Sequence, residues 1–190
     1  GNRIGSLCWN DQNDLATGNS GDPSRGLTEM GKVAVRKMNE LHFIIDVSHA
    51  NEKTFWDILE TSTQPIIATH SNAKALCPHP RNLDDKQILA INENDGLIGV
   101  TFAGQFLEHD YNDACIESIY RHIDYMLNIM GNDDHIGFGS DFDGISHPPY
   151  NLHGVQDYSA VYEYLSKKYS ASTVEKITHK NVLNLLQKVL

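Results

Sequence analysis

Residues 43–49 read Phe43-Ile44-Ile45-Asp46-Val47-Ser48-His49, a short apolar and β-branched run that ends in polar side chains. A continuous apolar run of this length is typical of a strand that is buried on both faces of a parallel sheet. Runs of the same kind occur at Pro65–Thr69, Gly96–Phe102 and His135–Gly139. Arg3–Trp9 is predicted as a further strand. The sequence therefore predicts five strands.

Segments with helical periodicity separate these runs. Apolar residues at helical spacing predict one helix over about residues 28–41 and others after Asn51, after Asp84 and from Ile116 onward. The residues that mark them are Met30, Ala34, Met38 and Leu41; Asn51, Phe55, Ile58 and Leu59; Asp84, Gln87, Ile88 and Ile91; and Ile116, Ile119, Ile123, Met126 and Met130. Two more helices are predicted beyond the Pro-rich loop 147–149, the last one opened by Ser172-x-x-Glu175.

Alternating strands and helices predict an α/β fold with a parallel sheet. The chain has 190 residues and five predicted strands, whereas a closed (β/α)₈ barrel has eight strands and about 250 residues. We expect either an open sheet or the C-terminal portion of a barrel, about five βα units long. Because the chain starts at Gly1 without an initiator Met, we expect residues 1–190 to be a single domain that lacks the N-terminal strands of such a barrel.

Composition excludes several classes of protein. With 15 Lys and Arg against 25 Asp and Glu, the net charge is −10, which argues against a nucleic-acid partner. No stretch approaches the roughly 20 apolar residues of a membrane span. Three widely spaced cysteines favour a reducing, cytoplasmic compartment. Neither GxGxxG nor GxxxxGK[ST] opens any helix, which removes the main support for a nucleotide site.

Polar side chains follow three of the predicted strands. His49 and His70 each follow a strand by a few residues, and Asp141 follows the run 135–139. Parallel sheets place ligands at the carboxyl ends of their strands, so these groups are expected at one rim. Imidazoles are zinc ligands, a carboxylate can move protons, and the guanidinium of Arg81 is shaped to bind a substrate carboxylate. Each residue taken alone has an ordinary structural alternative, and for Asp46 this is the capping of a helix or the bracing of a loop.

Six segments resemble the renal (membrane) dipeptidase family, in order and with matching spacing. They are Gly26-Leu27-Thr28-x-x-Gly31, Met38-Asn39-x-Leu41, Ile45-Asp46-x-Ser48-His49, Pro65-x-x-x-x-His70-Ser71, Arg81-Asn82-x-x-Asp85 and Gly137-x-Gly139-x-Asp141-Phe142-Asp143-Gly144. The members of this family are zinc peptidases on a (β/α)₈ metallohydrolase barrel. The resemblance thus implies a metal-dependent dipeptidase.

The resemblance also implies roles for single residues. His49 and His70 would ligate one Zn²⁺ of a binuclear pair, and Arg81 would bind the C-terminal carboxylate of the dipeptide. Asp141 would serve the substrate amino group and proton transfer, with Asp143 beside it. A zinc-bound hydroxide would attack the peptide carbonyl. The family's remaining ligands, a His-x-Asp pair and a bridging Glu, lie upstream of this stretch, so the chain is expected to be incomplete and inactive alone.

One segment departs from the family pattern. Mammalian members end their first segment in Leu-Thr-His, whose His contacts substrate, whereas this sequence has Leu7-Cys8-Trp9. The departure predicts a bacterial-type member in which Trp9 lies in the substrate site. Two alternatives stay open: a catalytically silent binding or scaffold protein on the same barrel, and another barrel amidohydrolase acting on a carboxylate-bearing amide. A homodimer is also compatible with the sequence.

Overall fold

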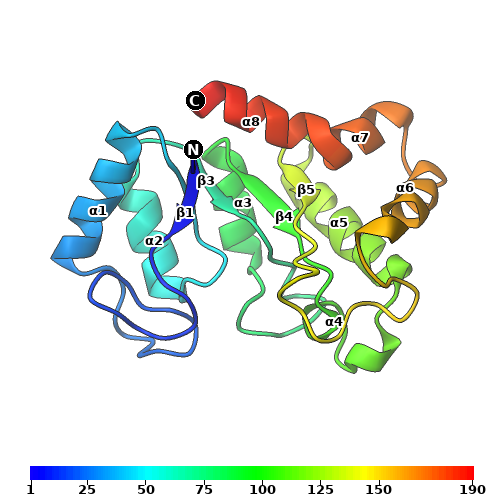
Figure 1. Ribbon diagram of the computed structural model, residues 1–190, viewed down its shortest axis with the longest axis horizontal. Helices are drawn as coiled ribbons and strands as arrows, with labels where there is room; N and C mark the ends of the chain where they lie inside the picture. The colour runs from blue at the N-terminus through cyan, green and yellow to red at the C-terminus, as the bar shows by residue number, and fades with distance from the viewer.

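The computed structural model describes all residues from Gly1 to Leu190 and contains one five-stranded parallel sheet (Figure 1). Its strands are β1 (Ile4–Ser6), β2 (Ile44–Asp46), β3 (Ile66–Ala68), β4 (Leu97–Val100) and β5 (Ile136–Phe138). The register pairs Ile4 with Ile44, Ile45 with Ile66, Ile67 with Leu97 and Ile98 with Ile136. All five predicted strands are confirmed, each shorter than the apolar run that predicted it.

The strands follow one another across the sheet in the order β1-β2-β3-β4-β5. Every crossover therefore runs in the same direction, and because βαβ crossovers are right-handed, the connecting helices lie on one face of the sheet. A doubly wound sheet would reverse its strand order and carry helices on both faces. The observed order is that of a barrel wall.

The helices that connect the strands begin where the sequence predicts. They are α1 (Glu29–Glu40), α2 (Glu52–Thr61), α3 (Asp85–Glu93) and α5 (Ile116–Met130). Thr28 and Asn51 accept hydrogen bonds from backbone amides three residues on and so cap α1 and α2. Asp84 and Gln87 form the predicted capping box of α3.

The remaining elements are less regular. A short helix, α4 (Gly104–Leu107), and two single turns at 111–113 and 155–157 were not predicted. Beyond the Pro-rich loop come α6 (Tyr158–Ser166) and then α7 (Ala171–Glu175), a π-helical turn (Lys176–Lys180) and α8 (Asn181–Val189) without a break. The capping prediction for Ser172 is wrong, because Ser170 accepts the hydrogen bond from Thr173 and Ser172 lies inside α7. None of the helices is both long and apolar enough to cross a membrane.

Alternate strand residues belong to two separate apolar clusters, as the two-residue period of a strand requires. The larger cluster lies between the sheet and its helices, and its strand members are Ile45, Ile66, Ala68, Ile98, Val100 and Ile136. The smaller cluster lies on the opposite, inner face and consists of Ile44, Ile67, Leu97, Leu185 and Val189. Helix α8 supplies the last two residues and crosses the amino ends of the strands (Figure 1). The carboxyl ends of the inner face are left for polar side chains.

Candidate functional site

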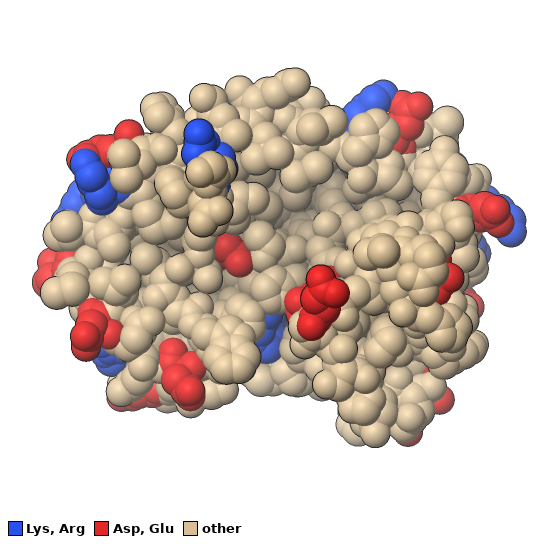
Figure 2. Space-filling model, in the orientation of Figure 1, with Lys and Arg blue, Asp and Glu red and all other residues tan.

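A pocket of about 580 Å³ opens at the carboxyl ends of the strands. Its walls are Trp9, Asn10, Asn19, Ser20, His49, His70, His79, Pro80, Arg81, Gln105, Phe106, Asp141, Gly144 and Ile145. All five side chains that the sequence singles out as site residues line it, although they come from four different strand-end loops. The structure thus brings them together. Figure 2 shows a hollow in the middle of one face, and most charged side chains visible in this view lie toward the outer edge of the molecule.

Two imidazoles meet inside this pocket. His49 follows β2 and His70 follows β3, and their Nε2 atoms lie 3.0 Å apart. Their ring planes are inclined at 62° with centroids 4.9 Å apart, so the rings meet edge to face rather than stacking. Two nitrogens that bind one tetrahedral Zn²⁺, each at about 2.0–2.1 Å, are about 3.3–3.4 Å apart. The observed spacing lies close to this value.

A chain of hydrogen bonds fixes the tautomer of His70. The hydroxyl of Thr69 donates to Asp46 Oδ2 at 2.7 Å, since a carboxylate can only accept. The same hydroxyl oxygen lies 2.7 Å from His70 Nδ1 and accepts a hydrogen bond from it. Nδ1 of His70 therefore carries the hydrogen, and the lone pair on Nε2 faces the pocket. A histidine that binds a metal through one ring nitrogen usually donates the N–H of its other ring nitrogen to a neighbouring group, which fixes the orientation of the ring.

His49 is held in the same tautomer by different partners. Its Nδ1 lies 2.9 Å from Asn10 Oδ1, an acceptor, and therefore carries the hydrogen. Its Nε2 lies 3.3 Å from Nη2 of Arg81, which can only donate. The Nε2 atoms of His49 and His70 thus both bear lone pairs only 3.0 Å apart, and the Arg81 N–H is the donor nearest to the one on His49. A shared cation would turn this repulsion into two bonds, so the residues present fit a metal ion.

The charge state of these rings agrees with that geometry. Burial, followed by the neighbouring Arg81 charge, lowers the pKa of His49 to about 4. Burial and Arg81 likewise lower the pKa of His70, with Asp46 and Asp141 acting in the opposite direction. Both imidazoles are therefore neutral at neutral pH, which is the form that binds metals.

Glycine at position 139 explains how His70 reaches the middle of the pocket. A Cβ atom there would lie only 1.8 Å from the carbonyl oxygen of Thr69, and one at Gly99 only 2.1 Å from the same oxygen. The chain that leaves β3 therefore crosses directly over the inner face of β4 and β5. The amide of Ser71 donates to the Gly99 carbonyl at 2.9 Å and holds it there. His70 is carried inward by this crossing.

Arg81 forms the buried cationic wall of the pocket. Its side chain is only 6% exposed, and burial lowers its pKa to about 10, still far above neutral pH. Its Nη1 atom is buried and has no hydrogen-bond partner in the protein. A charged donor without an acceptor is costly to bury. The guanidinium is therefore ready for an anionic partner from outside the chain.

Asp141 and Trp9 complete the polar and apolar sides of the mouth. Asp141 has a left-handed backbone with φ of 60°, which is unusual for a residue other than glycine and is common at functional sites. No protein group donates a hydrogen bond to its carboxylate, whereas Asp143 two residues on is exposed and outside the pocket. Trp9 is 69% exposed at the rim, with its ring centroid 6.1 Å from that of His49.

Among the lining residues that were not predicted, two aromatic rings lie against Arg81. His79 and Phe106 contact each other with ring centroids 4.3 Å apart, and Arg81 lies over the same Phe106 ring at 5.5 Å. The only sequence signal for His79 is its place two residues before Arg81. Asp46, in contrast, has the structural role that was considered for it: its carboxylate accepts from the backbone and hydroxyl of Ser48 and from those of Thr69.

Two imidazoles are the whole metal-ligand set that this chain brings together, because it contains no group of three His, Cys, Asp or Glu placed to hold an ion.

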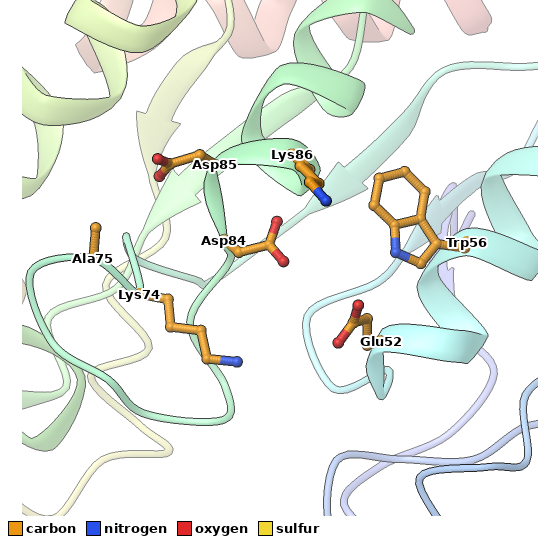
Figure 3. Close-up of a pocket in the computed structure, with 7 residues that line it drawn as sticks. All are labelled: Glu52, Trp56, Lys74, Ala75, Asp84, Asp85 and Lys86. Carbon is orange, nitrogen blue, oxygen red and sulfur yellow. The ribbon is translucent and has the colours of Figure 1, made fainter.

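A second groove of about 540 Å³ lies away from the strand ends. Figure 3 shows Glu52 and Trp56 of α2 facing Asp84 and Lys86 at the start of α3 across it. It contains no histidine, and its Asp84 is engaged as the cap of α3.

The family is decided by comparison with known proteins. A family model described as membrane dipeptidase (peptidase family M19) matches residues 1–190. The chain belongs to this family. A metallopeptidase from Rhodobacter sphaeroides, solved with a phosphinate mimic of the dipeptide L-Ala-D-Ala, superposes with a TM-score of 0.91 at 34% identity over 99% of this chain and 56% of its own. The sheet and helices are thus part of a (β/α)₈ barrel of the M19 type.

Curated relatives agree with this assignment. A Klebsiella pneumoniae protein of the pqqA 5′ region is 48% identical over 149 residues, which is 74% of this chain and 55% of its own length. The dipeptidase tcpJ of Claviceps purpurea is 37% identical over 168 residues, 86% of this chain and 39% of its own. The chain spans about half the length of the relatives that it matches.

Proposed function

We propose that the full-length M19 protein is a zinc-dependent dipeptidase. The observation that carries the proposal is the pair of Nε2 atoms of His49 and His70, 3.0 Å apart, with both Nδ1 hydrogens committed to other acceptors. Membership of a metallopeptidase family supports a metal between them. Neutral imidazole is a standard Zn²⁺ ligand, and the resemblance to a family of zinc peptidases is our reason for choosing Zn²⁺ among the metals that bind nitrogen.

Each of the five predicted site residues has a role in this proposal. His49 and His70 hold the metal, and the buried guanidinium of Arg81 binds the free carboxylate of the dipeptide in two parallel hydrogen bonds. Asp141, whose carboxylate has no protein partner, binds the substrate ammonium group. Trp9 covers the mouth and packs against a substrate side chain.

Chemistry requires a nucleophile and a path for one proton. A metal bound at this site supplies an activated water and polarises the scissile carbonyl. Arg81 and Asp141 grip the two charged ends of the dipeptide and so fix its carbonyl in a single orientation. Asp141 then receives the proton of the attacking water and delivers it to the leaving amine. This arrangement selects dipeptides over longer peptides, because Asp141 binds the ammonium group and Arg81 binds the carboxylate on either side of a single peptide bond.

Metal removal and restoration test the proposal directly. We expect the purified full-length protein to contain zinc by elemental analysis and to hydrolyse L-Ala-D-Ala, since the Rhodobacter sphaeroides relative binds a mimic of that dipeptide. A chelator should abolish hydrolysis, and added Zn²⁺ should restore it. His49→Ala should lower both zinc content and activity.

His179→Ala is the matched control, because that imidazole is exposed and far from the pocket. It should leave zinc content and hydrolysis unchanged. A full-length protein that is folded but contains no metal and gains no activity with added Zn²⁺ would falsify the proposal. That outcome would favour the silent scaffold instead.

A further inference from the structure

The imidazole of His79 has a defined tautomer. The backbone amide of Arg81 donates to His79 Nδ1 at 3.1 Å. Nδ1 therefore carries a lone pair, and the hydrogen of the neutral ring is on Nε2. Burial and the Arg81 charge both lower the pKa of His79, so the ring stays neutral beside the guanidinium.

The Nε2 hydrogen of His79 has no acceptor in the protein. The ring packs on Phe106 with a centroid distance of 4.3 Å and lines the same pocket as His49 and Arg81. Arg81 lies over the same Phe106 ring, and its Nη1 also has no partner. His79 and Arg81 therefore line the same pocket, and each has a donor without a protein acceptor: the neutral Nε2–H of His79 and the buried, charged Nη1 of Arg81.

We propose that His79 is a substrate-binding residue whose Nε2–H donates to the dipeptide carboxylate held by Arg81. This inference rests on the proposed function and deepens it. A carboxylate has two oxygens and about four lone-pair positions, more than one guanidinium edge fills. A neutral donor adds a hydrogen bond there without placing a second buried cation next to Arg81. His79 would then help the site to favour free dipeptides over peptides with a blocked C-terminus.

Nδ1 of His79 has a structural role, as acceptor for the Arg81 amide, and Nε2 has the proposed role in substrate binding. Two variants distinguish these roles. An Asn side chain can reproduce the Nδ1 acceptor but does not reach the Nε2 position, whereas Gln places an amide donor near Nε2 and loses the acceptor. If His79 contacts substrate, His79→Asn should raise KM for L-Ala-D-Ala about tenfold to a hundredfold, as expected for a lost hydrogen bond to a charged group. His79→Gln should stay within about threefold of wild type.

A dipeptide whose C-terminus is an amide provides the second arm of the experiment. The His79→Asn defect should be much smaller with this substrate, because the charged acceptor is absent. Thermal melting and zinc content of both variants establish that fold and metal are retained. The inference is overturned if His79→Asn matches wild type, if Gln is impaired as much as Asn, or if the amide substrate loses as much as the free dipeptide.

The test separates this inference from the proposed function. A wild-type protein that hydrolyses no dipeptide defeats the proposed function and His79's role with it. A wild-type protein that is active, with an unaffected His79→Asn variant, defeats only the role of His79.

Discussion

Asp46 illustrates how a residue near the pocket acts without lining it. Its carboxylate accepts hydrogen bonds from Ser48 and Thr69 and joins the loops that follow β2 and β3. Through the Thr69 hydroxyl it also determines which nitrogen of His70 faces the pocket. The metal-ligating geometry that we propose therefore depends on an acid that touches neither metal nor substrate.

Replacing Thr69 by Val tests this dependence. Valine keeps the branched shape but removes the hydroxyl, so His70 Nδ1 loses its acceptor and the ring is free to turn or change tautomer. We expect the affinity for Zn²⁺ to fall about tenfold to a hundredfold, the usual effect of losing an orienting partner. Competition with a chelating indicator measures it.

Thr69→Ser is the conservative control, since it keeps a hydroxyl at the same position. Its zinc affinity should lie close to that of wild type. Equal affinities of the Val and wild-type proteins would show that the hydrogen-bond chain has no influence on the metal site.

Sequence reasoning at the residue scale identified side chains but not their tautomers. Strand-end positions predicted that His49, His70 and Asp141 converge, and the structure brings them into one pocket, while their catalytic roles stay predictions. His79 could not be assigned a role from sequence, because its Nε2 donor exists only through the Arg81 amide that occupies Nδ1. Such a contact depends on loop conformation, which residue patterns do not encode.

Helix α5 is fastened to the rest of the fold through a buried histidine. His122 is 1% exposed, its Nδ1 accepts from the Ala73 amide at 3.1 Å, and its Nε2 donates to the Leu107 carbonyl at 3.0 Å. It joins the loop after β3 and the end of α4 to α5. The bond from the Ala73 amide requires the neutral ring, because a protonated ring cannot accept at Nδ1, whereas Nε2 donates in either form.

Stability should therefore depend on pH through His122. Burial lowers its pKa from the ordinary 6.5 to about 4, so the unfolded chain binds the proton more readily than the folded one. The stabilisation is complete above about pH 6.5 and is lost as the pH falls toward about 4, by up to roughly 3 kcal/mol. Urea unfolding at a series of pH values measures this loss.

His122→Gln supplies the comparison. Gln cannot titrate, so the free energy of unfolding of this variant should fall less steeply between about pH 6.5 and 4 than that of wild type. Parallel pH profiles for the two proteins would exclude His122 as a source of acid sensitivity.

At the level of the whole molecule, the carboxyl ends of the strands form the candidate site, and the amino ends contribute to stability. The carboxyl ends carry the pocket, whereas α8 covers the amino ends and buries Leu185 and Val189 against the inner face of the sheet. His42 Nδ1, 3.1 Å from the Val189 carbonyl oxygen, and the ion pair of Lys188 with Asp95 at 2.6 Å fasten this helix to the loops before β2 and β4.

Truncating one side chain of α8 tests its contribution. Leu185→Ala should lower the free energy of unfolding by about 2–4 kcal/mol through the cavity that it leaves. Leu183→Ala, on the same helix but 48% exposed, should cost less than about 1 kcal/mol. Urea unfolding compares them, and kcat of the Leu185 variant should be unchanged. A similar loss in both variants would mean that α8 contributes little through its buried face.

The architecture was only partly predictable from the sequence. Local periodicity predicted all five strands and the main helices, and the α/β class is confirmed. It could not choose between an open sheet and a barrel, because strand order depends on pairing between distant segments. The short apolar runs also overestimated strand lengths, since residues such as Thr101 are buried in strand-exit loops rather than in the sheet.

The packing of α8 against the amino ends of the strands has a practical consequence for engineering. A variant library confined to the strand-exit loops would leave the dry cluster under α8 intact. Such a library can be screened for activity on new substrates, while the fold retains the stability that comes from the apolar cluster at the amino ends of the strands.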